Sequence, residues 1–214
     1  MKILVTGSAG HLGEALMRSL QQSADHPVGL DIKSSEFTDF VGSITDKDVV
    51  EKAMEGCAAI FHTATLHKPH VGTHTRQDFV DTNITGTLNL LEQAIENDCM
   101  AFIYTSTTST FGDAMKVADG EPAVWVTEKL QPKPKNIYGV TKAAAEDICE
   151  LFHRRTGLPC LVLKPARFFP EEDDAKHKRD AFEDANLKVN ELLFRRVDIA
   201  GHSRRTSACV VEGC

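Results

Sequence analysis

The sequence predicts an α/β fold in which a parallel β-sheet is covered by helices on both faces. Short apolar runs rich in Val, Ile and Leu alternate with longer segments whose apolar residues recur at helical spacing. The short runs are continuously apolar, which is typical of strands buried on both faces. Together these observations indicate a doubly wound sheet, whose ligands bind beyond the carboxyl ends of the strands.

The first part of the chain contains three of the expected strands. Lys2–Thr6 (KILVT) is a continuous apolar run, and Leu12–Gln21 after it has apolar residues three and four apart. Pro27–Asp31 (PVGLD) is the second expected strand. Asp46–Gly56 has a helical pattern and ends on a glycine that can cap it. Ala58–Thr63 (AAIFHT) follows as the third strand.

The same alternation continues in the second part of the chain. Asp78–Glu96 contains the long helical pattern NITGTLNLLEQAIE, and it leads to the strand Ala101–Ser106 (AFIYTS). Ile137–Arg155 places its apolar residues on one stripe, as a helix packed on a sheet does. Cys160–Lys164 (CLVLK) is the last expected strand, and the chain becomes highly charged soon after it.

The composition is ordinary for a globular domain. The 214 residues are 42% apolar and 26% charged. The formal net charge of -7 disfavours nucleic acid and anionic membranes as partners, because both attract basic surfaces. No apolar run approaches the roughly 20 residues that span a bilayer, and the N-terminal run is too short for a signal peptide. We therefore expect a cytoplasmic protein without a membrane partner.

Neither the cysteines nor the histidines predict a metal site. The six cysteines form no CxxC pair, so we expect reduced thiols, most of them in the core. His67, His70 and His74 share one expected loop, but no carboxylate or cysteine completes a ligand set beside them. We therefore expect no metal.

Three glycines lie between the first strand and the first helix. Gly7, Gly10 and Gly13 in TGSAGHLG occur where a dinucleotide-binding turn is expected, although such turns also occur without a cofactor. Glycine permits a tight bend, close approach of a pyrophosphate and close packing of helix on strand. The N-terminus of the following helix then attracts the phosphates. The spacing GxxGxxG makes this turn one residue longer than GxGxxG.

Asp31 ends the second strand, 18 residues after Gly13. This is near the spacing of about 20 residues at which a carboxylate binds the hydroxyls of the adenosine ribose. A carboxylate there would repel the 2′-phosphate of NADP, so the pattern favours NAD, although Lys33 offers a positive charge nearby. The alternative is a solvated turn residue without a cofactor.

Tyr138 and Lys142 in NIYGVTK lie four apart at the start of a helix, so they share one face. A nearby ammonium lowers the pKa of a phenol, which is ordinarily about 10, and so fits it for general acid/base catalysis. The hydroxyl-rich run YTSTTSTFG follows a strand at the carboxyl edge, where one hydroxyl could bind a substrate oxygen. The alternatives are an incidental YxxxK and a loop that bonds its own backbone.

The glycines, the acid, the hydroxyl run and YxxxK occur in the order found in the short-chain dehydrogenase/reductase superfamily. TGSAGHLG resembles the TGxxGxxG fingerprint of its extended branch, the NAD-dependent epimerase/dehydratase family. AIFHTAT is similar to VxHxAA, NITGTLNLLEQA to NVxGTxNLLEAA, and YTSTTSTFG to SSSxxVYG. The resemblance covers residues 1–170.

The resemblance implies a Rossmann-like NAD-binding domain over residues 1–170 and a partial substrate-lobe segment over 171–214. It implies acid/base catalysis by Tyr138, assisted by Lys142 and by the hydroxyl of Thr107. The implied cofactor contacts are Gly7, Gly10, His11, Leu12, Gly13, Asp31, Ser43, Ile44, Thr63, Ala64, Thr65, Asn83, Thr105, Tyr138, Lys142 and Pro165. The implied substrate contacts are His67, Thr108, Arg167 and Phe168.

Three departures from the family pattern qualify these implications. Ser43 stands where the family often has an acid near the adenine, and Thr107 replaces the commoner serine. Extended members also carry a longer C-terminal segment that builds a substrate lobe, and the tail GHSRRTSACVVEGC resembles no part of it. We therefore expect a truncated C-terminal substrate lobe.

The sequence thus predicts an NAD-dependent oxidoreductase or epimerase that acts on an alcohol, with sugar nucleotides as the family's commonest substrates. Return of the hydride would make it an epimerase or dehydratase, and release of NADH a dehydrogenase; the motifs leave this open. The alternatives are a catalytically incomplete NAD-binding protein and an inactive fragment. The resemblance also implies a homodimer paired through the helices that carry Asn83 and Tyr138.

Overall fold

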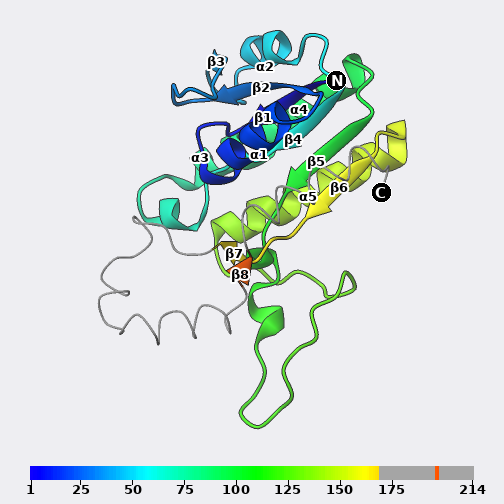
Figure 1. The fold of residues 1–214 in the computed structure, drawn as a ribbon. Helices are drawn as coiled ribbons and strands as arrows, with labels where there is room; N and C mark the ends of the chain where they lie inside the picture. The colour runs from blue at the N-terminus through cyan, green and yellow to red at the C-terminus, as the bar shows by residue number, and fades with distance from the viewer. Residues whose placement is uncertain (169–195, 198–214) are drawn as a thin grey trace.

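A six-stranded parallel sheet forms the centre of the molecule (Figure 1). The computed structural model describes residues 1–168 and 196–197. The strand order is β3-β2-β1-β4-β5-β6, so it reverses between β1 and β4, where ligands of such sheets bind. The strands are β1 (Lys2–Thr6), β2 (His26–Asp31), β3 (Phe40–Val41), β4 (Ala59–His62), β5 (Ala101–Thr105) and β6 (Cys160–Leu163).

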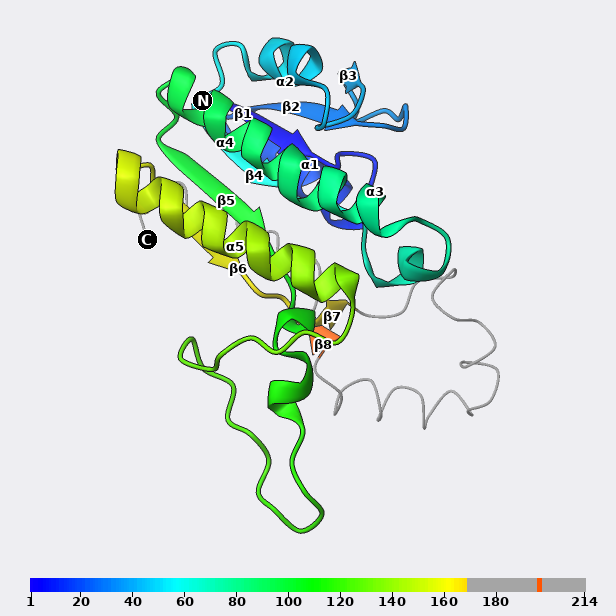
Figure 2. The same cartoon turned by 180° about the vertical axis from the view of Figure 1, so that it is seen from behind.

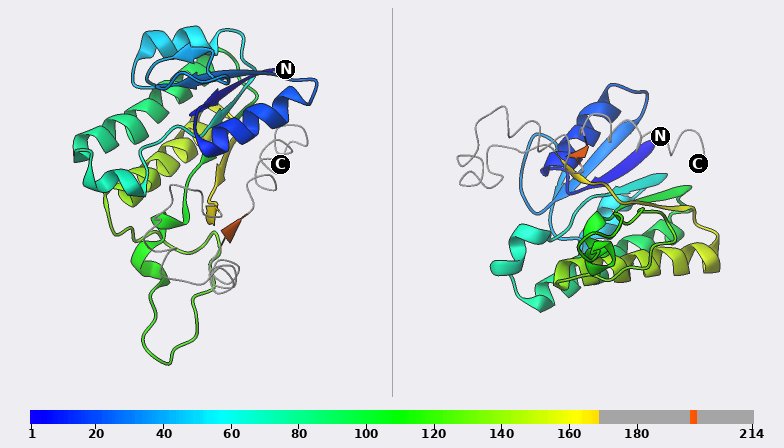
Figure 3. Two further views of the ribbon diagram at one scale, coloured as in Figure 1. Left: turned by 60° about the vertical axis from the view of Figure 1, so that its left-hand side comes forward. Right: turned by 90° about the horizontal axis from the view of Figure 1, so that it is seen from below.

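Helices cover the sheet on both faces, as the sequence predicts. Figure 2 shows α4 and α5 side by side on one face, and Figure 3 shows α1 on the other. The helices are α1 (His11–Gln21), α2 (Lys47–Met54), α3 (Arg76–Val80), α4 (Gly86–Glu96) and α5 (Ile137–Thr156). The short helical turns are η1 (Lys68–Gly72), η2 (Asp81–Thr85), η3 (Thr108–Thr110) and η4 (Gly112–Met115).

Alternation along the strands divides the core into two layers. Ile3 and Val5 of β1 pack with residues of α1, such as Leu16. Leu4, which lies between them in sequence, packs instead with Leu90 of α4 and with residues of α2 and α5. Successive side chains of a strand point to opposite faces, so a continuously apolar strand serves both layers. The doubly wound fold expected from the sequence is confirmed.

Two features of the fold were not expected from the sequence. The strand β3 has only two residues, Phe40 and Val41, and extends the sheet beyond β2. The helix expected at Asp78–Glu96 begins at Arg76 and is interrupted by the π-helical turn η2. Such a turn adds one residue to the helical repeat and changes the direction of the side chains that it carries.

The long helix α5 is capped at both ends. Asn136 Oδ1 accepts a hydrogen bond from Gly139 N over 3.0 Å, which satisfies one of the first N–H groups of the helix. Gly157 has a φ of +79° and ends the helix, with its N–H donating to His153 O. None of the helices in the described part is long and apolar enough to cross a membrane.

A second, smaller sheet pairs β7 (Arg167–Phe168) with β8 (Arg196–Val197) in parallel. Most of the expected substrate-lobe segment, residues 171–214, lies outside the described residues. Cys57, Cys99, Cys149 and Cys160 are free thiols, as expected, whereas Cys209 and Cys214 lie outside the described residues.

Candidate active site

The glycine-rich turn joins the carboxyl end of β1 to the start of α1. Gly7 has a φ of +74°, which side chains rarely adopt, and its N–H donates to Leu30 O over 2.8 Å. A Cβ at Gly13 would lie 1.9 Å from Gly7 O, so only glycine lets α1 approach the turn this closely. Gly10 precedes α1, whose N-terminus carries a partial positive charge that favours an anion.

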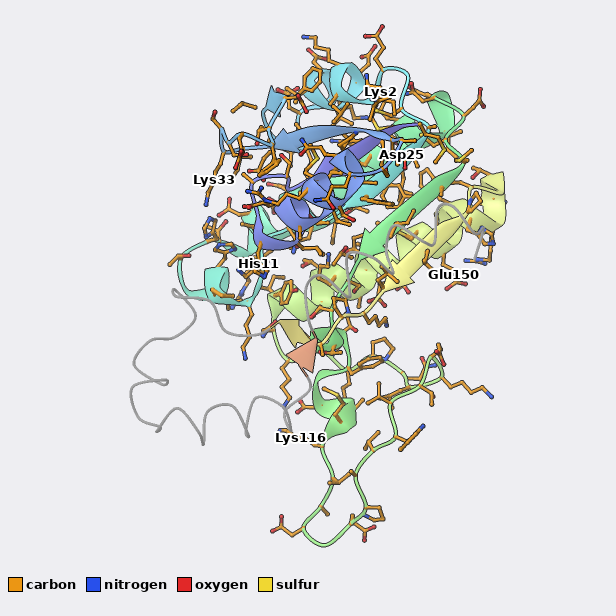
Figure 4. All side chains as sticks on the ribbon, in the orientation of Figure 1. Lys2, His11, Asp25, Lys33, Lys116 and Glu150 are labelled. Carbon is orange, nitrogen blue, oxygen red and sulfur yellow. The ribbon has the colours of Figure 1, made fainter. Side chains whose placement is uncertain are left out.

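Asp31 at the end of β2 fastens the glycine turn to the sheet. Its Oδ2 accepts a hydrogen bond from Ala9 N over 3.0 Å, and its Oδ1 accepts one from Lys33 N over 2.8 Å. The carboxylate therefore lies beside the turn, where the sequence predicts the adenosine ribose. Figure 4 shows Lys33 just beyond this strand end and His11 at the start of α1.

Lys142 is buried on the face of α5 that packs against the sheet. Its Nζ donates to Thr105 O over 2.7 Å and lies 4.0 Å from the centroid of the Tyr104 ring. Burial lowers the pKa of Lys142 to about 7, although the charges of Cys149 and Glu146 act in the opposite direction. A lysine that titrates near neutral pH at the carboxyl edge of a parallel sheet is typical of a functional site.

Tyr138 lies one helical turn before Lys142 and is largely buried. Burial raises the pKa of Tyr138, while a hydrogen bond with Thr107 lowers it in part. Thr107 follows β5, and its hydroxyl also accepts a hydrogen bond from Ser109 N over 3.1 Å. Residues 106–112, which follow β5, form a loop that we call the hydroxyl loop. A Cβ at Gly139 would lie 2.8 Å from Ser109 O, so this glycine lets α5 approach the hydroxyl loop closely. The structure thus brings together the three predicted catalytic residues.

A buried histidine, which lies in the segment AIFHTAT and for which no role was predicted, links the turn to the helices. His62 Nδ1 lies 2.7 Å from Thr6 Oγ1, which already accepts hydrogen bonds from Thr63 N and Ala64 N. Thr6 Oγ1 therefore donates to Nδ1, and the ring proton is on Nε2. Nε2 donates to Thr87 Oγ1 over 2.9 Å. His62 is thus held as one neutral tautomer.

Lowering the pH is expected to destabilise the protein through His62. Burial and, to a lesser extent, the charge of Lys142 hold the pKa of His62 well below 6.5 in the folded chain. The folded state therefore binds fewer protons than the unfolded state below about pH 6.5, and stability falls there by up to about 1.4 kcal/mol per pH unit. Urea unfolding at pH 7.5 and at lower pH should show this loss, and His62→Gln should reduce it.

The matched control for that experiment is His26→Gln, because His26 is exposed at the start of β2. This variant should keep the pH dependence of the unmodified chain. An equally steep loss of stability in His62→Gln would show that other groups cause it.

Asn83, a predicted cofactor contact, lies beside α5, the helix that carries Tyr138 and Lys142. It sits in the π-helical turn η2, and its side-chain oxygen accepts hydrogen bonds from Thr65 Oγ1 and Leu66 N, both over 2.9 Å. Its amide nitrogen donates to Leu66 O and to Thr141 Oγ1, both over 3.0 Å. Asn83 therefore ties the segment after β4 to α5, one turn from Tyr138.

The remaining predicted cofactor residues fall into two groups. Thr63 and Ala64 border the turn, since a Cβ at Gly7 would lie 2.8 Å from Thr63 Oγ1 and Ala64 N. The side chains of Leu12 and Ile44, by contrast, belong to the core, so only their backbone can face a cofactor. For this second group, any contact with a cofactor must therefore come from the backbone.

Other predicted contacts follow the carboxyl ends of β3, β5 and β6. Ser43 Oγ lies 2.8 Å from Thr45 Oγ1, so its hydroxyl is engaged within its own loop. Thr108 N donates to Pro165 O over 3.4 Å, which joins the hydroxyl loop to the end of β6. Of the predicted substrate contacts Arg167 and Phe168, only the backbone in β7 is described.

The rings of the three loop histidines lie against one another at tilted angles. The ring centroids of His67 and His70 are 4.3 Å apart, and those of His70 and His74 are 5.0 Å apart. His67 N donates to His70 Nδ1 over 3.1 Å, so this nitrogen is engaged in the loop itself. Among the described residues, no group of His, Cys, Asp and Glu is arranged to hold a metal ion.

The order of glycine turn, strand-end acid and YxxxK helix is shared with proteins already known. A sequence model of the NAD dependent epimerase/dehydratase family matches residues 3–202. This chain belongs to that family. It is 29% identical to an uncharacterised UDP-glucose epimerase of Bacillus subtilis, over 79% of this chain and 56% of the relative. It is also 29% identical to a dTDP-glucose 4,6-dehydratase of Haemophilus influenzae, over 76% and 54%.

Solved structures of the family share the fold. The UDP-glucose 4-epimerase of Thermotoga maritima, solved with UDP-glucose, matches with a TM-score of 0.71 at 28% identity. The match covers 81% of the present chain and 58% of the Thermotoga maritima epimerase. The family member thus spans about half the length of the curated relatives that it matches.

Proposed function

We propose that the chain provides the cofactor-binding and catalytic part of an NAD-dependent oxidoreductase or epimerase. The observation that carries this proposal is the convergence of Tyr138, Lys142 and Thr107 at the sheet edge that also holds the glycine turn. The residues fit a dinucleotide, because a Cβ at Gly13 would fill the turn and Asp31 lies beside it. The turn and the N-terminus of α1 would hold the pyrophosphate, and Asp31 the ribose hydroxyls.

In this proposal Tyr138 accepts the proton of a substrate alcohol. NAD, when bound, supplies the hydride acceptor and a positive charge near the phenol. Burial raises the pKa of Tyr138, so without added positive charge the phenol is protonated at neutral pH. Lys142 lies one helical turn away, and its ammonium favours the phenolate. Thr107, in hydrogen-bond contact with Tyr138, donates to the substrate oxygen.

We also propose a sugar nucleotide as the substrate, supported by the epimerase and dehydratase relatives named above. Both of their reactions can begin with oxidation of a ring hydroxyl, so the same three residues would serve either one. His67 and Thr108 lie in loops after β4 and β5 and would contact this substrate. A homodimer through α4 and α5 stays a prediction.

Titration of the chain with NAD and NADP by calorimetry tests the cofactor assignment. We expect saturable binding that prefers NAD, and Asp31→Asn should weaken it about tenfold to a hundredfold. Hydrogen bonds to a charged group contribute about 1.5–3 kcal/mol, and their loss accounts for this range. The same change should narrow the preference over NADP, because it removes the charge that repels the 2′-phosphate.

Asp25→Asn is the matched control, because Asp25 lies at the opposite end of the sheet, beside the N-terminus (Figure 4). This variant should bind NAD as the unmodified chain does. Equal binding of both cofactors, or unchanged NAD affinity in Asp31→Asn, would contradict the assignment. Absence of binding to either cofactor in a folded chain would mean that the cofactor-binding part is not functional as it stands.

A further inference from the structure

We propose that Glu146 is a positioning residue that holds the hydroxyl loop and Lys142 in place for catalysis. The proposal rests on the proposed function, because it concerns the same three catalytic residues. Glu146 lies on α5, one turn after Lys142, at the end of the segment NIYGVTKAAAE, and no role was predicted for it from the sequence. Its side chain is only 12% exposed, which is unusual for a carboxylate and calls for partners.

Both oxygens of this carboxylate are engaged. Ser106 Oγ donates a hydrogen bond to Glu146 Oε1, and Lys164 Nζ lies 2.7 Å from Oε2. Ser106 directly follows β5, and Lys164 directly follows β6. One side chain on α5 therefore joins the carboxyl ends of two neighbouring strands.

The contact with Ser106 controls the position of Thr107. Lys142 donates to Thr105 O, and Glu146 accepts from the side chain of the next residue, Ser106. Two consecutive residues of the strand end are thus held by two consecutive turns of α5. Thr107 is the next residue, so this attachment, together with the hydrogen bond from Ser106 N to Leu163 O over 2.7 Å, would hold its hydroxyl near Tyr138.

The contact with Lys164 supports the other side of the same loop. Lys164 Nζ lies 4.7 Å from the centroid of the Phe111 ring, which belongs to the hydroxyl-rich run. The next residue, Pro165, accepts a hydrogen bond from Thr108 N. Loss of Glu146 would leave Lys164 without its buried partner and release both attachments of the loop.

Glu146 also acts on Lys142 by charge. Its carboxylate favours the protonated ammonium and so opposes part of the lowering of the Lys142 pKa by burial. Removal of this charge should therefore lower the pKa of Lys142 further below its present value of about 7. The hydrogen bond to Ser106 and the charge near Lys142 are separate effects, and different variants separate them.

The test is NMR of the full chain labelled with 13C at tyrosine Cζ and lysine Cε. The chain has only two tyrosines, so Tyr138 gives one of two tyrosine signals. Glu146→Ala and Ser106→Ala should each shift the Tyr138 signal at neutral pH. The double variant should shift it no further than Glu146→Ala alone, because Glu146→Ala already removes the attachment through Ser106. Glu146→Gln keeps an acceptor for Ser106 and should shift it less.

The lysine signals report the charge effect. The titration midpoint of Lys142 should fall in Glu146→Ala and Glu146→Gln but not in Ser106→Ala, which keeps the carboxylate. The matched control is Glu150→Ala (Figure 4), one turn further along α5, where the carboxylate is exposed and pairs with Arg154 at 3.3 Å. This variant should change neither signal.

An unshifted Tyr138 signal in folded Glu146→Ala would overturn the proposal, and so would independent, additive shifts in the double variant. Should Glu146→Ala fail to fold, Ser106→Ala alone decides, because an unshifted Tyr138 signal there is equally contrary. Neither measurement requires NAD or turnover. Failure of the proposed function in the calorimetric titration is therefore distinguishable from failure of this inference.

Discussion

Alanine at position 13 is expected to abolish NAD binding and to lower the free energy of unfolding by about 3 kcal/mol. The added Cβ would lie 1.9 Å from Gly7 O, 2.6 Å from Gly7 C and 2.9 Å from Ser8 Cα. All three are backbone atoms of the turn, so no side chain can rotate to relieve the contact. Either α1 must move away from the sheet or the turn must change shape, and both displace the expected pyrophosphate site. Urea unfolding and calorimetry with NAD measure the two effects.

Two other glycines provide controls for this experiment. A Cβ at Gly72 would meet no atom within 4 Å, so Gly72→Ala should leave both stability and binding nearly unchanged. Gly56 also has free space but a φ of +68°, so Gly56→Ala should cost about 1 kcal/mol through backbone strain alone. NAD affinity preserved in Gly13→Ala would mean that the turn does not bind the pyrophosphate.

The parts of the fold that depend on local pattern were predictable from the sequence. The strand Lys2–Thr6 was predicted with its observed bounds, because a continuous apolar run between a polar residue and a glycine has few alternatives. The strand β3 was missed because Phe40 and Val41 are too few to form a pattern. They pair with Leu30 and Asp31 of β2, and this contact depends on the tertiary structure rather than on a local sequence pattern.

The candidate site was likewise predictable where it depends on local spacing and not where it depends on tertiary contacts. Tyr138 and Lys142 were predictable, since a spacing of four places two residues on one face of any helix. The contacts of His62 and Glu146 were not, because a family motif marks His62 without naming its partners, and Glu146 is in sequence an ordinary helical acid. Their partners Thr6 and Ser106 lie 56 and 40 positions away in the chain. Only the register of the sheet and the packing of α5 bring each pair together.

Phenylalanine at position 138 is expected to reduce turnover by about a thousandfold, within the range that a positioned acid/base contributes. The change removes one oxygen atom and keeps the ring, which is largely buried against its neighbours. NAD affinity and stability should therefore change little, whereas the substrate proton loses its acceptor. Single-turnover formation of protein-bound NADH from a UDP-sugar, followed by absorbance, measures the oxidation with which either reaction begins.

The other tyrosine of the chain makes the control for this experiment specific. Tyr104 is fully buried, and its ring lies under the ammonium of Lys142, so Tyr104→Phe keeps that contact. Because the hydroxyl of Tyr104 belongs to the core rather than to the hydroxyl loop, its loss should leave turnover nearly unchanged. Similar losses in both variants would indicate a general disturbance of α5. Turnover preserved in Tyr138→Phe would assign proton transfer to another group, whereas a loss confined to position 138 with NAD affinity intact would leave the phenol oxygen as the acceptor.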